Sequence, residues 1–64
     1  MVQMNGQNED VAGLRLMDYL IQHNYRKDAI AVECNEQIIV KSRYEEYVLR
    51  DGDVVEIVSF VGGG

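Results

Sequence analysis

The last long apolar run of the chain, residues 54–61 (VVEIVSFV), most constrains how the chain can fold. The run is rich in β-branched side chains, which favour extended backbone. Successive side chains of a strand point to opposite faces, and here apolar residues occur on both faces, interrupted by Glu56 on one and Ser59 on the other. The run therefore predicts a central strand, covered by a helix on one side and partly exposed on the other.

The remaining residues have to build one small core around this strand. A chain of 64 residues has room for a single domain, which buries only about 60% of the surface that its unfolded form exposes. Cys34 is the only cysteine and His23 the only histidine, so the chain can form neither an internal disulfide nor a zinc site. Apolar residues make up 47% of the sequence and proline is absent, a composition that favours folding over disorder.

The N-terminal part predicts a β-hairpin followed by a helix. Residues 2–5 begin an alternating run, Asn5-Gly6 is a strong signal for a type I′ turn, and residues 7–11 form the returning strand. The next segment has apolar residues at helical spacing, in one stripe of Leu16, Tyr19, Leu20 and His23 and a second of Leu14, Met17 and Ile21. We expect a helix from residue 14 or 15 to residue 24, and no side chain suited to cap the helix directly precedes it.

Two shorter strands follow the helix. In residues 29–34 the side chains of Ile30, Val32 and Cys34 face one way, and residues 37–40 form another strand after a turn at 35–36. Residues 41–47 predict a loop or a single helical turn, and residues 50–53 a turn in which Gly52 supplies the permissive backbone. This order of elements indicates an α+β roll, a mixed sheet of four or five strands packed on one helix, in which the first and last strands can pair in parallel.

The charge balance argues against two classes of partner. A net charge of −5, with six scattered Lys and Arg residues, does not suit a nucleic-acid backbone or an anionic membrane. No apolar run approaches the roughly 20 residues of a membrane span or forms the core of a signal peptide, and a lone thiol fits a reducing compartment, so we expect a cytoplasmic protein. Surface acids can steer the protein toward a basic partner or only keep it soluble: Glu45, Glu46, Asp51 and Asp53.

The remaining polar and aromatic residues favour structural roles over catalytic or metal-binding ones. His23 shares a helix stripe with leucines and is expected to pack or to lie at the edge of the core. Cys34 has no basic neighbour in the sequence to lower its pKa. Residues 51–53 (DGD) offer too few oxygen ligands for calcium and predict a turn. Tyr44 and Tyr47 are expected to rest their rings on the core and keep their hydroxyls in water.

The sequence stops at Gly62-Gly63-Gly64, directly after the predicted central strand. Glycine has no Cβ, so we expect residues 1–61 to form the domain and residues 62–64 a thin, flexible arm that reaches roughly 10 Å beyond the sheet. Such an arm can enter a constricted channel in another protein, although a frayed terminus would have the same composition. If Val55 and Ile57 face the helix, the opposite face next to this arm presents an apolar strip for docking or for covering by loops: Val54, Val58 and Phe60, with Val61 following.

Several motifs together resemble the ubiquitin-like β-grasp group, and within it the ThiS family of sulfur carrier proteins of thiamin biosynthesis. The motifs are Met4-Asn5-Gly6, Leu16-x-Asp18-x-Leu20, residues 32–35 (VECN), residues 51–58 (DGDVVEIV) and residues 60–64 (FVGGG). The chain departs from the family in two connections, with Arg15 where a Thr often precedes the helix and Val40-Lys41 where a Pro-Arg pair is common.

The resemblance implies a carrier that is acted on by enzymes and is not itself an enzyme. A ubiquitin-activating-type adenylating enzyme would draw Gly62, Gly63 and Gly64 into its ATP site and adenylate the Gly64 carboxylate. Sulfur from a persulfide donor would then convert the adenylate to a thiocarboxylate, which delivers sulfur to thiazole synthase. The carrier would bind no cofactor or metal of its own, because ATP is used by the partner.

Two other functions remain open at the level of the sequence. A related carrier for molybdopterin or another thiolated product would use the same tail chemistry. A β-grasp interaction module would have the same fold with glycines that do no chemistry. An enzyme is least supported, because the sequence shows no pairing of a nucleophile with a base.

Overall fold

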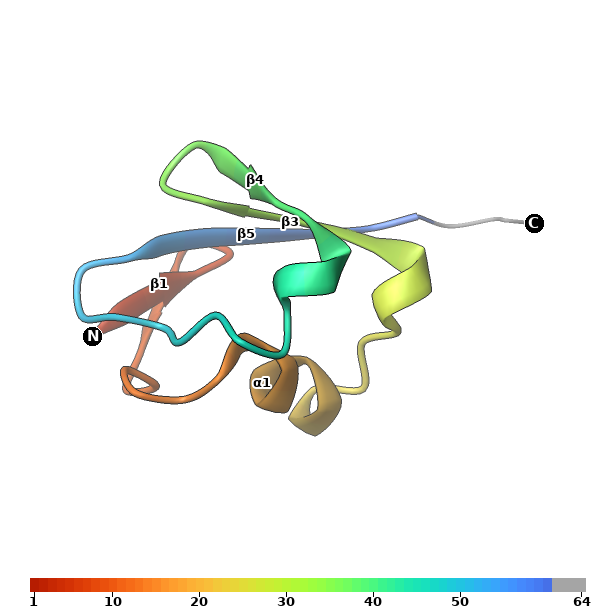
Figure 1. Cartoon of the computed structure of the whole chain (residues 1–64). Coiled ribbons are helices and arrows are strands. Elements are labelled where there is room, and N and C mark those ends of the chain that lie inside the picture. Colours follow the sequence, from red (N-terminus) through yellow and green to blue (C-terminus); the bar gives the residue numbers. More distant parts are fainter. Residues whose placement is uncertain (61–64) are drawn as a thin grey trace.

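The computed structural model describes residues 1–60, which form a five-stranded mixed sheet packed on one helix (Figure 1). The strands are β1 (Val2–Met4), β2 (Gln7–Glu9), β3 (Ile30–Cys34), β4 (Gln37–Ile39) and β5 (Val54–Ser59), and the helix is α1 (Leu16–Gln22). Two short 3-10 turns, η1 (Lys27–Ala29) and η2 (Lys41–Arg43), precede β3 and follow β4. The predicted α+β roll is confirmed.

The strand β5 occupies the centre of the sheet, whose order is β2-β1-β5-β3-β4. It pairs in parallel with β1, where Gln3 lies opposite Val54, and antiparallel with β3, where Val32 lies opposite Ile57. Both predictions for this strand, its central place and its parallel pairing with the first strand, are confirmed. β1 pairs with the first two residues of β5, whereas β3 pairs with β5 as far as Ser59, so β3 supports the backbone of the last residues of the strand.

Both hairpins turn through left-handed backbone. The positive φ angles lie at Asn5 (50°), Gly6 (86°), Asn35 (52°) and Glu36 (70°). The predicted Asn-Gly turn is thus confirmed, and the second turn uses the same conformation without a glycine. The returning strand β2 ends at Glu9 and not at Val11, because the chain bends at Asp10 to leave the sheet toward the helix.

The helix α1 is shorter than the sequence pattern predicts. It spans Leu16–Gln22, and the left-handed backbone of Asn24 (φ 62°) stops its continuation. Leu16, Tyr19 and Leu20 face the sheet and are buried, as the first stripe predicts. Of the second stripe, Leu14 and Met17 are partly buried against the core, whereas Ile21 is 63% exposed.

The start of α1 is capped by backbone carbonyls from a distant segment. The N–H groups of Leu16 and Met17 donate to the carbonyl oxygens of Tyr47 (2.8 Å) and Tyr44 (3.0 Å). The N-cap residue Arg15 makes no side-chain hydrogen bond to the helix. The segment after η2 therefore closes over the helix start and supplies partners that the sequence next to the helix lacks.

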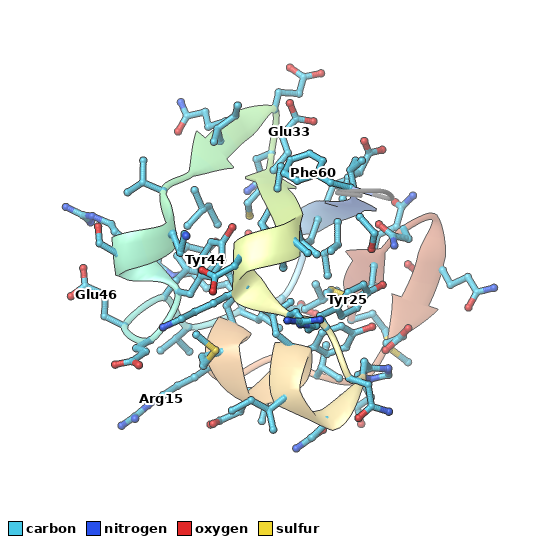
Figure 2. All side chains as sticks on the ribbon, turned by 90° about the vertical axis from the view of Figure 1, so that its right-hand side faces the viewer. Arg15, Tyr25, Glu33, Tyr44, Glu46 and Phe60 are labelled. Carbon is cyan, nitrogen blue, oxygen red and sulfur yellow. The ribbon has the colours of Figure 1, made fainter. Side chains whose placement is uncertain are left out.

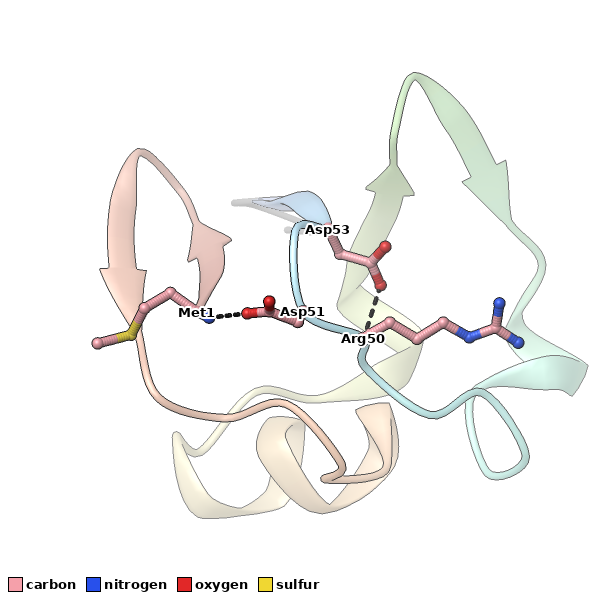
Figure 3. A network of polar contacts seen from close by, with 4 residues as sticks. All are labelled: Met1, Arg50, Asp51 and Asp53. Atoms are coloured by element: carbon pink, nitrogen blue, oxygen red, sulfur yellow. Dashed lines mark hydrogen bonds and ion pairs between the residues drawn. The ribbon is translucent and has the colours of Figure 1, made fainter.

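The turn before β5 also fastens the N-terminus (Figure 3). Gly52 adopts a φ of 91°, and the Arg50 N–H donates to Asp53 Oδ2 at 3.0 Å, so the predicted turn over residues 50–53 is confirmed. The Gly52 N–H donates to the Met1 carbonyl oxygen at 2.8 Å, and the Met1 ammonium group forms an ion pair with Asp51. These contacts hold the first residues beside the entry to the central strand.

Candidate functional site: the open face of the sheet

The helix covers one face of the sheet and leaves the other open (Figure 1). Side chains of β5 alternate between the two faces: Val55 and Ile57 are 0% and 7% exposed in the core. On the open face, Val54, Val58 and the following Phe60 are 42%, 57% and 59% exposed. The prediction that β5 turns one set of apolar residues toward the helix and another set to the opposite face is therefore confirmed. No loop within residues 1–60 covers the outward set.

The neighbouring strands extend this open face. Ala31 of β3 lies opposite Val58, and Ile38 of β4 lies opposite Glu33 with 72% of its surface exposed. The sequence did not single out Ile38, because residues 38–40 are three apolar residues in a row and either face could have been the inner one. The pairing register shows that Ile39 faces inward and Ile38 outward, since it places Ile39 opposite the buried Val32.

The charged side chains of the three central strands are all acidic. Glu33 on β3 and Glu56 on β5 lie directly opposite each other and are exposed. Every Lys and Arg of the chain lies outside the five strands, at residues 15, 26, 27, 41, 43 and 50. Figure 2 shows Glu33 and Phe60 on the side of the sheet away from the helix, and Arg15 on the opposite side of the molecule.

The hydrogen bonds of β5 extend to the last residue that the structure describes. The Phe60 N–H donates to the Ala29 carbonyl oxygen at 2.7 Å, one step beyond the assigned strand. Val61, Gly62, Gly63 and Gly64 lie outside the described residues. The predicted tail, the docking role of Val61 and the division of the chain after residue 61 therefore stay predictions.

Asp53, at the other end of β5, is not the surface acid that the sequence predicted. Its side chain is buried and accepts hydrogen bonds from the Tyr47 hydroxyl (2.7 Å), the Asn35 amide (3.0 Å) and the Arg50 N–H (3.0 Å). Burial opposes ionisation of this carboxyl, but the hydrogen bonds outweigh it and hold its pKa below the ordinary value. Through these three hydrogen bonds, Asp53 connects the start of β5 with the turn between β3 and β4 and with the segment of residues 47–50.

The Tyr47 hydroxyl belongs to the same network. It lies 3.1 Å from Cys34 Sγ as well as 2.7 Å from Asp53, so the expectation of a water-exposed hydroxyl is wrong for this residue. Burial raises the pKa of the Cys34 thiol, which is 6% exposed, and so disfavours the reactive thiolate. This burial agrees with the structural role predicted for Cys34.

The ThiS family model matches residues 2–64 of the chain. The chain belongs to the ThiS family. Its similarity to the sulfur carrier protein ThiS of Bacillus subtilis is 43% identity over 68 aligned positions, which cover the whole of both chains. The resemblance inferred from the sequence motifs is confirmed.

Two further relatives of this ThiS chain bear on its fold and its partners. A thiamine biosynthesis protein (ThiS) from Geobacter metallireducens, solved by crystallography, has a TM-score of 0.76 and 27% identity over 98% of this chain and 97% of that one. This likeness confirms the β-grasp fold. A thiazole synthase of Magnetococcus marinus is 31% identical over 64 residues, which cover 98% of this chain and 20% of that protein.

The other residues singled out in this ThiS chain do not gather into a reactive site. His23 is exposed at the edge of the core, where its ring stacks on Tyr19 with the ring centroids 4.0 Å apart. Burial and the nearby Glu9 carboxylate, which accepts a hydrogen bond from the Tyr19 hydroxyl at 3.3 Å, raise the pKa of Tyr19 to about 12.

Residues 1–60 contain no group of three or more His, Cys, Asp and Glu side chains placed to hold a metal ion. No helix in this range has the length and apolar character needed to cross a membrane.

Proposed function

We propose that this ThiS chain is a sulfur carrier of thiamin biosynthesis that other enzymes act on. The match of the ThiS family model up to residue 64, together with the full-length similarity to a sulfur carrier, is the observation that carries this proposal. The described residues supply the five-stranded body and an open sheet face on which apolar side chains of β5 are exposed. The working group of the proposal is a main-chain carboxylate, that of Gly64.

The Gly64 carboxylate needs activation before sulfur can replace one of its oxygens, because oxide is a very poor leaving group. A ubiquitin-activating-type adenylating enzyme supplies ATP, whose α-phosphate is attacked by the carboxylate with release of pyrophosphate. The terminal sulfur of a persulfide then displaces AMP, and a thiol reduces the resulting acyl disulfide to the thiocarboxylate. Glycines at 62–64 suit this reaction, because a segment without Cβ atoms can pass through a narrow channel to the ATP.

The proposed receiver of the sulfur is thiazole synthase. A protein of that name contains a stretch similar to nearly the whole of this chain, which supports a shared pathway for carrier and synthase. We place the carrier in the cytoplasm, since the buried, unpaired Cys34 thiol suits a reducing compartment.

The open face of β5 is the proposed docking surface for the adenylating enzyme. Val54, Val58 and Phe60 stay exposed, although apolar side chains of this size normally contribute to a core. They lie on the strand that leads directly to the tail, so docking on this face brings the tail toward the partner's active site. We propose that Val61 continues this surface.

An intact-mass measurement tests the proposed function. The chain is incubated with an extract of its host, ATP and cysteine, and a carrier gains the mass difference between sulfur and oxygen. The gain has to depend on ATP and to disappear when Gly64 is deleted or when a residue is added after it. An unchanged mass, under conditions that thiolate a known carrier, would overturn the proposal. Rescue of a strain that requires thiazole, and not of one that lacks molybdopterin, identifies the pathway.

A further inference from the structure

Two like charges meet at the centre of the open face. Glu33 of β3 and Glu56 of β5 are direct partners in the antiparallel ladder. Hydrogen-bonded and non-hydrogen-bonded pairs alternate along such a ladder, and the bond from the Asn35 N–H to the Val54 carbonyl assigns the Glu33–Glu56 pair to the hydrogen-bonded kind. The Cβ atoms of such a pair lie about 5 Å apart on the same face of the sheet, and like charges placed directly opposite each other destabilise a sheet.

No cation of the described chain offsets this repulsion. The ion pairs among residues 1–60 join Met1 with Asp51, Lys41 with Asp28, and Arg43 with Glu46. Two shallow depressions of the open face share Glu33 and Glu56 in their walls, and one of them also includes Glu36. The centre of the face is therefore negative in the free protein, and the depression without Glu36 adds the apolar side chains of Ala31, Ile38 and Val58.

We propose that Glu33 and Glu56 together receive one arginine of the adenylating enzyme, framed by apolar contacts to Val58 and Ile38. This inference rests on the proposed function and specifies the chemistry of its docking surface. A guanidinium group presents several N–H donors in a plane and can bond two carboxylates at once. Its aliphatic stem can lie along the depression that Ala31, Ile38 and Val58 line beside the two glutamates. The partner surface thus presents an arginine next to apolar side chains.

The two glutamates then have opposite effects on the free and the bound protein. In the free carrier they repel each other, so neutralising one of them stabilises the fold. In the complex they share a cation, so the same change weakens binding. A purely structural or solubilising role would not couple these two effects.

The test compares Glu33→Gln, Glu56→Gln and the double variant with the native chain. Glu45→Gln is the matched control, because it removes the same charge from an exposed position in the segment after η2. Thermal unfolding gives the stability of each free variant. Calorimetric titration with the purified adenylating enzyme of the same organism gives the dissociation constant of each variant, at about 0.05 M and about 0.5 M salt.

We expect each single variant to melt about 1–3 °C above the native chain. The double variant should bind the adenylating enzyme about tenfold more weakly at low salt, and the difference should shrink at high salt. An affinity for the adenylating enzyme that is unchanged in the double variant, or weakened as much by Glu45→Gln, overturns the inference. A native chain that gains no sulfur in the mass measurement overturns the proposed function itself, so the two failures are distinguishable.

Discussion

The side chain of Asn5 binds both backbone groups of Ile57, a residue 52 positions away in the sequence. Its Oδ1 accepts the Ile57 N–H at 2.7 Å, and its Nδ2 donates to the Ile57 carbonyl oxygen at 3.3 Å. The main chain of β1 turns away from β5 at this point, so the amide continues the pairing of the two strands. Asn5 thereby combines the left-handed turn of the first hairpin with support for the strand that leads to the tail.

Replacing Asn5 by glycine should lower the free energy of unfolding by about 1–2 kcal/mol, because glycine keeps the left-handed turn but loses both bonds to Ile57. Denaturation with urea measures the change. Asn24→Gly is the matched control, since Asn24 also has a positive φ (62°) and makes no such bond to β5. The control should stay within about 0.5 kcal/mol of the native chain, and equal losses in both variants would contradict the assignment.

Replacing Asp53 by asparagine should destabilise the protein near neutral pH by about 1–3 kcal/mol, because the amide cannot accept the three hydrogen bonds that the carboxylate receives. The folded pKa of Asp53 lies below its ordinary value of about 3.9. Its contribution to stability is therefore complete above about pH 4 and is lost as the pH falls through the lower, folded value. Urea unfolding at a series of pH values should show the two proteins converging in acid, and a constant difference would argue against this role.

Val55 and Val58 lie on opposite faces of β5, so the same substitution can be compared at a buried and at an exposed position of one strand. Val55→Ala should lower the free energy of unfolding by about 2–3 kcal/mol, because Val55 is fully buried in the core. Val58→Ala should change it by less than about 0.5 kcal/mol, since this side chain is 57% exposed. Urea unfolding measures both changes. Under the proposed function, Val58→Ala slows sulfur loading instead. An unaltered loading rate would show that Val58 is not part of the docking surface.

Replacing Arg15 by serine should stabilise the protein by about 0.5–1 kcal/mol. Arg15 holds the N-cap position in extended backbone (φ −71°, ψ 143°) without a side-chain hydrogen bond, and a serine hydroxyl can accept the N–H of Asp18 from there. Thermal and urea unfolding of Arg15→Ser and Arg15→Ala give the comparison. The alanine variant lacks the acceptor, so a similar gain in both would show that the loss of the arginine, and not capping, is the cause.

Much of the fold could be predicted from short stretches of sequence. The Asn5-Gly6 turn, the three buried residues of α1 and the two faces of β5 each follow from neighbouring residues: turn preference, helical spacing and strand alternation. The ThiS resemblance likewise depends on motifs that are readable along the chain. The predicted β2 and α1 are longer than the observed ones, because each element ends where the chain turns toward the next element.

The sequence alone determined the central strand and the apolar residues that it turns outward, because alternation along a strand is a local property. Only the tertiary structure decided that Asp53 is buried, that the Tyr47 hydroxyl bonds inside the protein, and that carbonyls of residues 44 and 47 cap the helix. It also placed Glu33 opposite Glu56 and turned Ile38 outward. These features depend on register and on contacts between distant segments, and the partner of a polar group is set by where the chain returns in space.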